Sequence, residues 1–286
     1  MTAPIQNVRP FAIGDLTVGG PRLLWIMGPC LLESEDVALR VGQRLADEVI
    51  KTKRQIVFKG SFDKANRLRG DSPRGLGLEE GLKILARVKA ETGLPVTTDI
   101  HHPEDAPMVA AIVDLIQIPA FLCRQTDIVE SAAKTMKPVN IKKGQFLSPR
   151  DMEHLASKAV GVGNADVVLT ERGTTFGYGD LVVDYRSLAI MRRSGFPVCF
   201  DASHSVQSPG AGGGRSSGQR EFLLPLMRAA LAVGVDAVFC EVHPDPPRAL
   251  SDRDTQWRLD DIGAVFETAD RLEDHRRGIL EFANGR

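Results

Sequence analysis

The sequence lacks several features that would assign a protein to a class at once. Its cysteines are few and far apart and form no Cys-x-x-Cys pair, a pattern that suits reduced thiols in the cytosol. They are Cys30, Cys123, Cys199 and Cys240. The most apolar region, residues 108–122, is broken by Asp114 and Gln117 and is too short to span a membrane. Residues 1–10 contain no apolar segment typical of a secretory signal, so we expect a cytoplasmic protein.

The chain also has almost no net charge. Its 36 lysine and arginine residues oppose 37 aspartate and glutamate residues, giving a formal charge of -1. This balance argues against bulk binding to nucleic acid or to a membrane surface, so any basic cluster must be local. With 286 residues, 43% of them hydrophobic and 26% charged, the chain can form one large globular domain or two small ones.

A short apolar run followed by an amphipathic stretch recurs along the sequence, and such runs are typical of strands buried on both faces. We predict eight strands, at residues 23–27, 56–58, 96–100, 115–118, 139–141, 167–169, 198–200 and 237–240. The helices that follow them are predicted at residues 34–52 and 78–92, from about 103, 126 and 148, at 185–194 and 221–233, and from 259. Residues 1–20 are predicted to form a short N-terminal hairpin or arm.

Eight strand-helix units without a linker match the usual size of a (β/α)8 TIM barrel, an α/β fold of about 250 residues. We therefore predict one catalytic domain over residues 1–286. A doubly wound open sheet is the alternative. That fold normally carries a glycine fingerprint after its first strand, whereas this chain has Gly28-Pro29-Cys30-Leu31 there.

Cations follow several of the predicted strands, and in a barrel the loops after the strands form the face where chemistry occurs. Any one of these cations could be a solvated or ion-paired residue. Together, at successive strand ends, they predict a site for anionic substrates, such as two phosphorylated small molecules. The six are Lys59, Lys64, Arg67, Arg124, Lys142 and Arg172.

A second set contains one thiol, one imidazole and two carboxyl groups, in the loops after the first, seventh and eighth strands. It consists of Cys30, His204, Glu241 and Asp252. The last strand of a barrel pairs with the first, so these loops should be neighbours. Such a mixture of soft and hard donors suits a divalent ion such as manganese, iron, cobalt or zinc. The alternative is that the thiol is an inert core group and that the histidine is a polar residue with its hydrogen bonds already made.

The glycine-rich residues 208–218 fit neither a P-loop nor a dinucleotide fingerprint. They predict either a mobile lid over the barrel mouth or a disordered surface loop. His101, His102 and His243 fall near the same face, and we expect them to support the site or to lie on the surface.

Several ordered motifs between residues 24 and 259 closely resemble the 3-deoxy-D-manno-octulosonate 8-phosphate synthase family. They are KGSFDKANR at 59–67, QIPAF at 117–121, KKGQF at 142–146, RG and FGY within 172–178, DASHSVQ at 201–207 and EVHPDP at 241–246. The resemblance implies a (β/α)8 barrel, usually a homotetramer, that condenses phosphoenolpyruvate with D-arabinose 5-phosphate and releases inorganic phosphate. The product of that family feeds the lipopolysaccharide inner core.

By position, the resemblance implies a phosphoenolpyruvate clamp of four cations, Lys59, Lys64, Lys142 and Arg172. It assigns the pentose phosphate to Asn66 and Arg67, with Arg124 reaching across a subunit boundary. The remaining expected substrate contacts are Ser61, Asp99, Gln117 and Gln145, and the expected catalytic residues are Lys59, Lys64, Lys142 and His204. Cys30 resembles the metal-dependent members of the family, whereas metal-free members carry asparagine there.

The chain departs from the family pattern in two places. Leu68-Arg69-Gly70 stands where serine or threonine commonly helps to hold the sugar phosphate, and Arg69 is a candidate substitute for those contacts. Arg253-Asp254 replaces a common Gly-Pro after Asp252, which makes Asp254 a less favoured rival ligand.

Two other functions are alternatives. The related synthase that uses erythrose 4-phosphate typically carries Lys-Pro-Arg-Thr and Gly-Ala-Arg motifs, where this chain has residues 59–67 and Pro119-Ala120-Phe121. A non-catalytic barrel that senses phosphosugars is the second. Such a sensor needs affinity but no groups for the transition state, so the lysine clamp and the metal set argue against it.

Overall fold

The eight predicted strands pair side by side and close into a parallel barrel in the computed structural model, which describes residues 8–66, 70–176, 178–209 and 217–283. The strands, in barrel order, are β3 (Leu24–Gly28), β4 (Gln55–Lys59), β5 (Val96–Asp99), β6 (Leu115–Ile118), β7 (Val139–Lys142), β8 (Val167–Glu171), β11 (Val198–Asp201) and β12 (Ala237–His243). The barrel closes where β11 pairs with β12 and β12 pairs with β3. The predicted (β/α)8 architecture is confirmed.

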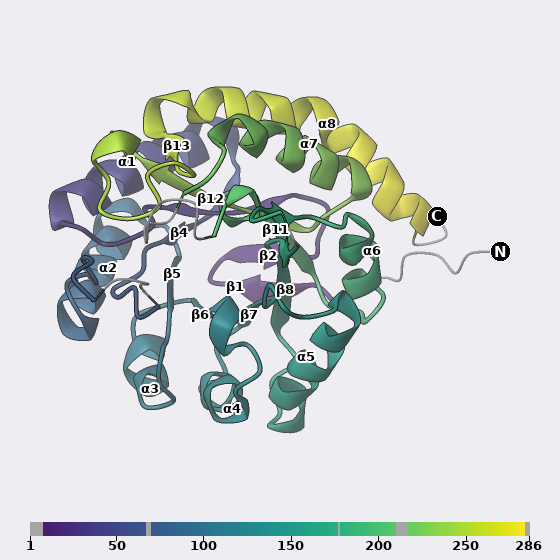
Figure 1. Cartoon of the computed structure of the whole chain (residues 1–286), viewed down its shortest axis with the longest axis horizontal. Coiled ribbons are helices and arrows are strands. Elements are labelled where there is room, and N and C mark those ends of the chain that lie inside the picture. The colour runs from purple at the N-terminus through teal and green to yellow at the C-terminus, as the bar shows by residue number, and fades with distance from the viewer. Residues whose placement is uncertain (1–7, 67–69, 177, 210–216, 284–286) are drawn as a thin grey trace.

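Helices surround the strands (Figure 1) and cover their apolar outer side chains. They are α1 (Glu35–Thr52), α2 (Leu78–Thr92), α3 (Asp105–Ala110), α4 (Thr126–Lys134), α5 (Met152–Gly161), α6 (Arg186–Arg192), α7 (Leu223–Val233) and α8 (Ile262–Ala283). The Ser34 hydroxyl caps α1 by accepting from the Val37 amide. Short 3-10 turns precede α5, α7 and α8, so these helices begin a few residues after their predicted starts. Of the helices in the described ranges, none is both long and apolar enough to cross a bilayer.

An antiparallel hairpin seals the amino-terminal end of the barrel. It consists of β1 (Phe11–Ile13) and β2 (Leu16–Val18), joined by a tight turn in which Gly14 has a φ of 57°. The hairpin side chains pack on residues that point into the barrel, including Leu24 and Val57 near the start of their strands. The predicted N-terminal hairpin is therefore confirmed, and it forms the floor of the barrel (Figure 1).

Three short strands lie outside the sequence prediction. Strands β9 (Thr174–Thr175) and β10 (Leu181–Val182) form a small hairpin in the long loop after β8. Strand β13 (Trp257–Arg258) pairs with the end of β12 beyond the barrel. Each contains two residues, too few for an alternating apolar pattern to be visible.

Candidate functional site

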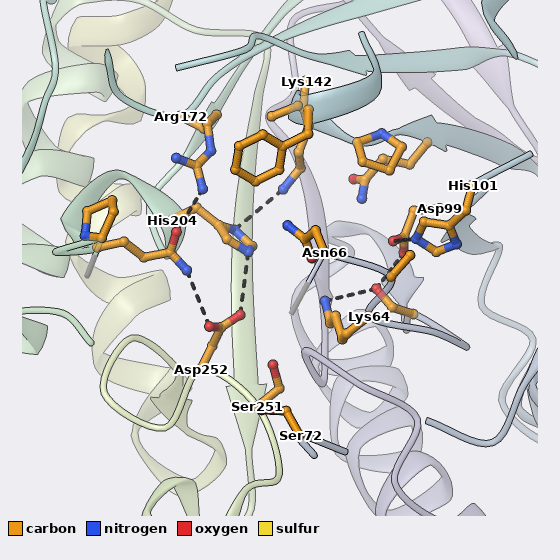
Figure 2. A pocket seen from close by; sticks show the side chains of 18 of the residues that line it. Lys64, Asn66, Ser72, Asp99, His101, Lys142, Arg172, His204, Ser251 and Asp252 are labelled. Carbon is orange, nitrogen blue, oxygen red and sulfur yellow. Dashed lines mark hydrogen bonds and ion pairs between the residues drawn. The ribbon is translucent and has the colours of Figure 1, made fainter. Parts of the chain in front are cut away.

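A cavity of about 750 Å³ opens at the carboxyl ends of the barrel strands. Most of the predicted site residues line it, although they are distant along the chain. These are Lys59, Ser61, Lys64, Asn66, Asp99, Gln117, Lys142, Gln145, Arg172, His204 and Asp252. Figure 2 shows Arg172 and His204 on one side, Lys64 and Asp99 on the other, and Lys142 and Asn66 pointing into the space between them.

Other predicted residues lie elsewhere. Cys30 and Glu241 are fully buried and contact residues of the cavity wall. Arg124 is exposed and does not line the cavity of its own chain, so its predicted contact across a subunit boundary stays a prediction. Arg67, with Leu68 and Arg69, lies outside the described residues, as do residues 210–216 of the predicted lid.

Lys142 is held at the end of β7 by groups from two other strands. Its ammonium group pairs with the Asp201 carboxylate and lies 3.5 Å from the centroid of the Phe239 ring. Burial lowers the pKa of Lys142, although the Asp201 charge opposes this shift. The ring and the carboxylate together keep a lysine in an interior position, with its ammonium group at the cavity.

Lys59 is held in a similar way at the end of β4. It donates to Glu241 Oε1 at 2.9 Å and to the Cys30 carbonyl oxygen at 2.8 Å. The lysine side chain is only 1% exposed, so the Glu241 charge is needed to compensate its own. Lys59 therefore joins the cavity wall to the Cys30 backbone and to the buried Glu241 carboxylate behind it.

Arg172, just after β8, presents a donor without a partner. Its Nη2 donates to Gln207 Oε1 at 2.8 Å, whereas its Nη1 is buried and has no acceptor among the described residues. Burial lowers the pKa of Arg172, with Asp201 and Asp252 opposing. A guanidinium with a free buried N–H group at a cavity is suited to an anionic ligand.

The opposite wall carries a chain of hydrogen bonds from Lys64 to His101. Lys64 Nζ donates to Ser61 Oγ at 3.1 Å, Ser61 donates to Asp99, and His101 Nε2 lies 3.1 Å from Asp99 Oδ2. Burial alone would lower the pKa of Lys64, but neighbouring acidic groups, including the Glu241 and Asp99 carboxylates, raise it above its usual value. This wall is therefore a charged, hydrogen-bonding surface.

The Asp99–His101 pair shifts both pKa values. Burial alone would raise the pKa of Asp99 and lower that of His101. Their mutual hydrogen bond and charges outweigh burial, so the pKa of Asp99 falls and that of His101 rises. Of the three histidines left open by the sequence, His101 lines the cavity, whereas His102 is exposed.

Two side chains behind the cavity and one on its wall form a cluster that could hold a metal ion. One ligand atom each of Cys30, Glu241 and Asp252 lies within 4.8 Å of the others. His204 Nε2 lies 3.7 Å from Glu241 Oε1 and 3.8 Å from Asp252 Oδ2. His204 therefore lies beside this cluster of three and is close to two of its members.

The donor set fits a divalent transition ion. Glu241 Oε2 is buried and has no hydrogen-bond partner among the described residues, so it can accept a metal ion without losing a contact. Burial, followed by the charges of Asp252 and Glu241, raises the pKa of Cys30 well above its usual value. The protonated thiol accordingly donates to Asp252 Oδ2 at 2.9 Å. A bound cation would offset the carboxylate charges and favour the thiolate.

The two candidate aspartates in the loop after β12 differ in burial. Asp252 is buried and its backbone has a φ of 46°, in the left-handed region that aspartate tolerates better than most residues. Asp254 is exposed and belongs to no cluster of metal-binding side chains within the described residues. The geometry favours Asp252, and the unusual backbone places its carboxylate beside Cys30.

Sequence reasoning assigned no role to Asp201, which orients the site histidine. Its Oδ2 lies 2.8 Å from His204 Nδ1, and its Oδ1 accepts from the His204 amide at 2.9 Å. In a neutral imidazole, a proton on Nδ1 that is donated to Asp201 leaves Nε2, which is directed at the cluster, free to bind a metal ion, as is common for metal-binding histidines. The signal was the Asp-x-x-His spacing at the end of β11, because the 3-10 turn η3 (His204–Val206) folds His204 back onto Asp201.

Comparisons with known proteins agree with this geometry. The model of the DAHP synthetase I family matches residues 4–276. A 2-dehydro-3-deoxyphosphooctonate aldolase from Geobacter metallireducens is 54% identical over 260 residues, which cover 91% of this chain and 96% of the relative. Proteins of the same name from Xylella fastidiosa and Methylococcus capsulatus are 52% and 50% identical, covering 91% and 93% of this chain and 95% of each relative.

Proposed function

Because this chain belongs to the DAHP synthetase I family, we propose that it condenses phosphoenolpyruvate with D-arabinose 5-phosphate. The products are 3-deoxy-D-manno-octulosonate 8-phosphate, a precursor of the lipopolysaccharide inner core, and inorganic phosphate. The relatives carry the name of the synthase family that the sequence motifs resemble, so the resemblance is confirmed. The observation that carries the proposal is the convergence of Lys59, Lys142 and Arg172, from three different strand ends, on one cavity.

The first role of these cations is to bind an anion of high charge. Phosphoenolpyruvate carries a phosphate and a carboxylate, which match the ammonium groups of Lys59 and Lys142 and the fork of Arg172. Gln145 also lines the cavity, and its Oε1 has no hydrogen-bond partner among the described residues. In the proposal, Lys64 completes the clamp from the opposite wall, while Asn66 and Arg67 hold the pentose phosphate.

The second role is to bring two mutually repelling reactants to reacting distance. C3 of phosphoenolpyruvate attacks the aldehyde carbon of the pentose, whose oxygen takes up a proton, and a C–C bond forms. Water adds at the former C2, and the resulting hemiketal phosphate loses phosphate by C–O cleavage. Cations fixed by Asp201 and Glu241 stabilise the phosphate and carboxylate charges without moving during the reaction.

Cys30, His204, Glu241 and Asp252 would hold the divalent ion, which we propose to be manganese, iron, cobalt or zinc. Such an ion, when bound, polarises a carbonyl oxygen or lowers the pKa of a water molecule. Asp201 keeps the His204 Nδ1 proton in place, so that Nε2 stays available as a ligand. The chain supplies the mixture of thiolate, imidazole and carboxylate that this group of ions accepts.

The test is phosphate release from phosphoenolpyruvate with arabinose 5-phosphate and, separately, with erythrose 4-phosphate, each with and without a chelator. We expect turnover with the pentose and loss of turnover after metal removal. Preference for the tetrose would overturn the assignment in favour of the erythrose-using synthase, which the names of the relatives do not favour. Binding of both compounds without phosphate release would instead identify a phosphosugar sensor.

We further propose that the enzyme is a homotetramer in the cytoplasm. The family resemblance supports the tetramer, and the exposed aromatic side chains of Phe121, Phe146 and Phe176 provide apolar surface for contacts between subunits. All four cysteines are free and buried, which suits a reducing compartment. Light scattering of the purified protein should give four times the chain mass, and a monomer would contradict this part of the proposal.

A further inference from the structure

Gln207 joins two parts of the site that have separate tasks. Its Oε1 accepts from Arg172 Nη2 at 2.8 Å, and its Nε2 donates to Asp252 Oδ1 at 3.3 Å. Arg172 belongs to the proposed anion clamp, and Asp252 belongs to the cluster of candidate metal ligands. One neutral side chain therefore lies between a cation and a carboxylate that serve different ligands.

The chemistry of these contacts requires an amide. The guanidinium of Arg172 only donates and the carboxylate of Asp252 only accepts, so the middle group must accept on one side and donate on the other. A glutamate at this position would place a carboxylate against Asp252, and a lysine would place an ammonium group against Arg172. Asparagine is one methylene shorter and cannot span both contacts. Glutamine meets both requirements, and its two hydrogen bonds determine which way the amide group points.

The backbone of Gln207 is fixed as well. Its carbonyl oxygen accepts from the Leu181 amide at 3.1 Å, and its amide donates to the His204 carbonyl oxygen at 3.3 Å. It also forms an isolated antiparallel bridge with Gly218. A side chain that starts from a fixed backbone loses less freedom in bridging two partners, so it can hold both of them in position.

We propose that Gln207 is a positioning residue that orients the Arg172 fork toward the phosphoenolpyruvate anion and the Asp252 carboxylate toward the metal ion at the same time. The phosphoenolpyruvate part of this inference rests on the proposed function. Substitution of this one residue should therefore weaken two separate binding events. Binding of the pentose should change little, because Gln207 contacts neither Lys64 nor Asn66 within the described residues.

The experiment compares Gln207→Met, which keeps the length and removes both hydrogen bonds, with Gln219→Met as a matched control. Gln219 lines the groove beside β10 and α7, which Gln207 also borders, but it does not line the cavity that contains Arg172 and Asp252. Metal affinity is measured on metal-stripped protein by competition between Co²⁺ or Zn²⁺ and a chromophoric chelator. The absorption bands of the Co²⁺ protein report the ligand geometry, and steady-state kinetics give KM for each substrate.

For Gln207→Met we expect metal affinity to fall about tenfold or more, in line with other partners of metal ligands. The Co²⁺ bands should shift, and KM for phosphoenolpyruvate should rise about tenfold with KM for the pentose almost unchanged. Gln207→Glu should raise KM for phosphoenolpyruvate further, because its carboxylate competes with the substrate for Arg172. Gln219→Met should match the parent protein in all four measurements.

Thermal unfolding of each variant separates positioning from loss of fold. If Gln207→Met unfolds near the assay temperature, Gln207→Asn, which keeps a polar amide, takes its place with the same expectations. Parental metal affinity, Co²⁺ spectrum and phosphoenolpyruvate KM in a folded Gln207 variant would overturn the inference. Absence of turnover in the parent protein would instead refute the proposed function, and the metal titration would still test the contact with Asp252.

Discussion

Lys143 Nζ lies 3.5 Å from Glu171 Oε1 in the interior, whereas the preceding Lys142 faces the cavity. Successive side chains at a strand end point to opposite sides, so two adjacent lysines perform different tasks. Lys143 also donates to Thr174 Oγ1 at 3.0 Å, and Glu171 Oε1 accepts from the amides of Arg172 and Gly173. This buried pair therefore fixes the loop that carries Arg172.

Removal of one member of that pair should destabilise the fold. We expect Lys143→Met to lower the free energy of unfolding by about 3–5 kcal/mol, because it leaves the Glu171 carboxylate buried without its partner. The double variant Lys143→Met/Glu171→Leu should recover most of the lost free energy of unfolding. Urea unfolding followed by circular dichroism measures both effects. Lys83→Met, which breaks an exposed pair with Glu80, is the control and should change stability little. Equal losses in the single and double variants would contradict this account.

Arg172→Lys should weaken binding of phosphoenolpyruvate specifically. Lysine keeps the charge but loses the planar fork, so it cannot contact Gln207 and a substrate anion together. We expect KM for phosphoenolpyruvate to rise about ten- to a hundredfold, with KM for the pentose changed far less. Steady-state kinetics with each substrate varied in turn measure the difference. Arg150→Lys, at an exposed position, serves as the control, and equal effects on both KM values would refute the assignment.

Metal removal should abolish activity. After chelation and verification of the metal content, we expect turnover to disappear and to return on addition of Mn²⁺ or Zn²⁺. Cys30→Asn, which copies the residue of metal-free members of the resembled family, should retain measurable turnover that a chelator does not affect. Full activity of the stripped parent enzyme would defeat the metal assignment. A folded but wholly inactive Cys30→Asn variant would count against the prediction that this substitution converts a metal-dependent enzyme into a metal-free one.

Asp99 should control the protonation of His101. In the parent protein we expect a pKa of His101 above its ordinary value of 6.5. In Asp99→Asn, burial is opposed only by the smaller effect of the Asp63 charge, so the pKa of His101 should fall below its value in the parent protein. Titration of histidine labelled with carbon-13, followed by NMR, measures this shift directly. As a control, His102→Gln removes the exposed neighbouring histidine and should leave the pKa of His101 unchanged.

The same pair predicts how stability depends on pH. Because the pKa of His101 is raised in the folded state, its stabilising contribution is complete below the unfolded value near 6.5 and is lost as the pH rises through the folded value. The stability difference between the parent and Asp99→Asn should therefore be larger at pH 6 than at high pH. A difference that grows with pH would contradict the pairing.

Arg124 should act on the active site of a neighbouring subunit. We expect Arg124→Ala to raise KM for the pentose and to leave KM for phosphoenolpyruvate nearly unchanged. Mixed oligomers of Arg124→Ala with Lys142→Met subunits should recover activity, because some sites then combine an intact Lys142 with an intact Arg124 from a partner. Kinetics after mixing and refolding test this, with each variant alone as control. No recovery in verified mixed oligomers would argue against a shared site.

The sequence predicted the barrel and its mouth well for a simple reason. Parallel strands in a closed barrel all end on one face, so residues after strands converge whatever their separation in the chain. That argument placed Lys59, Lys142 and Arg172 correctly on one cavity. It needed only the strand positions, and the buried apolar runs gave those.

The contacts between side chains were not predictable in this way. The bridge of Gln207 to Arg172 and Asp252 depends on how loops after β8, β11 and β12 pack, and these loops have no periodic pattern. The left-handed backbone of Asp252 is a property of a tight loop that the sequence Ser251-Asp252-Arg253 does not announce. Lys143 was indistinguishable from Lys142 until the direction of each side chain was known.

The hairpin of β1 and β2 makes the barrel blind-ended, since its apolar side chains plug one end. Reactants and products must therefore enter and leave through the open end of the barrel. Lys142 and Arg172 are almost wholly shielded from solvent, whereas Asn66 is exposed nearer the entrance. A molecule held by the deep cations would lie behind one held at the entrance, so under the proposed assignment of the two sites phosphoenolpyruvate should bind before the sugar.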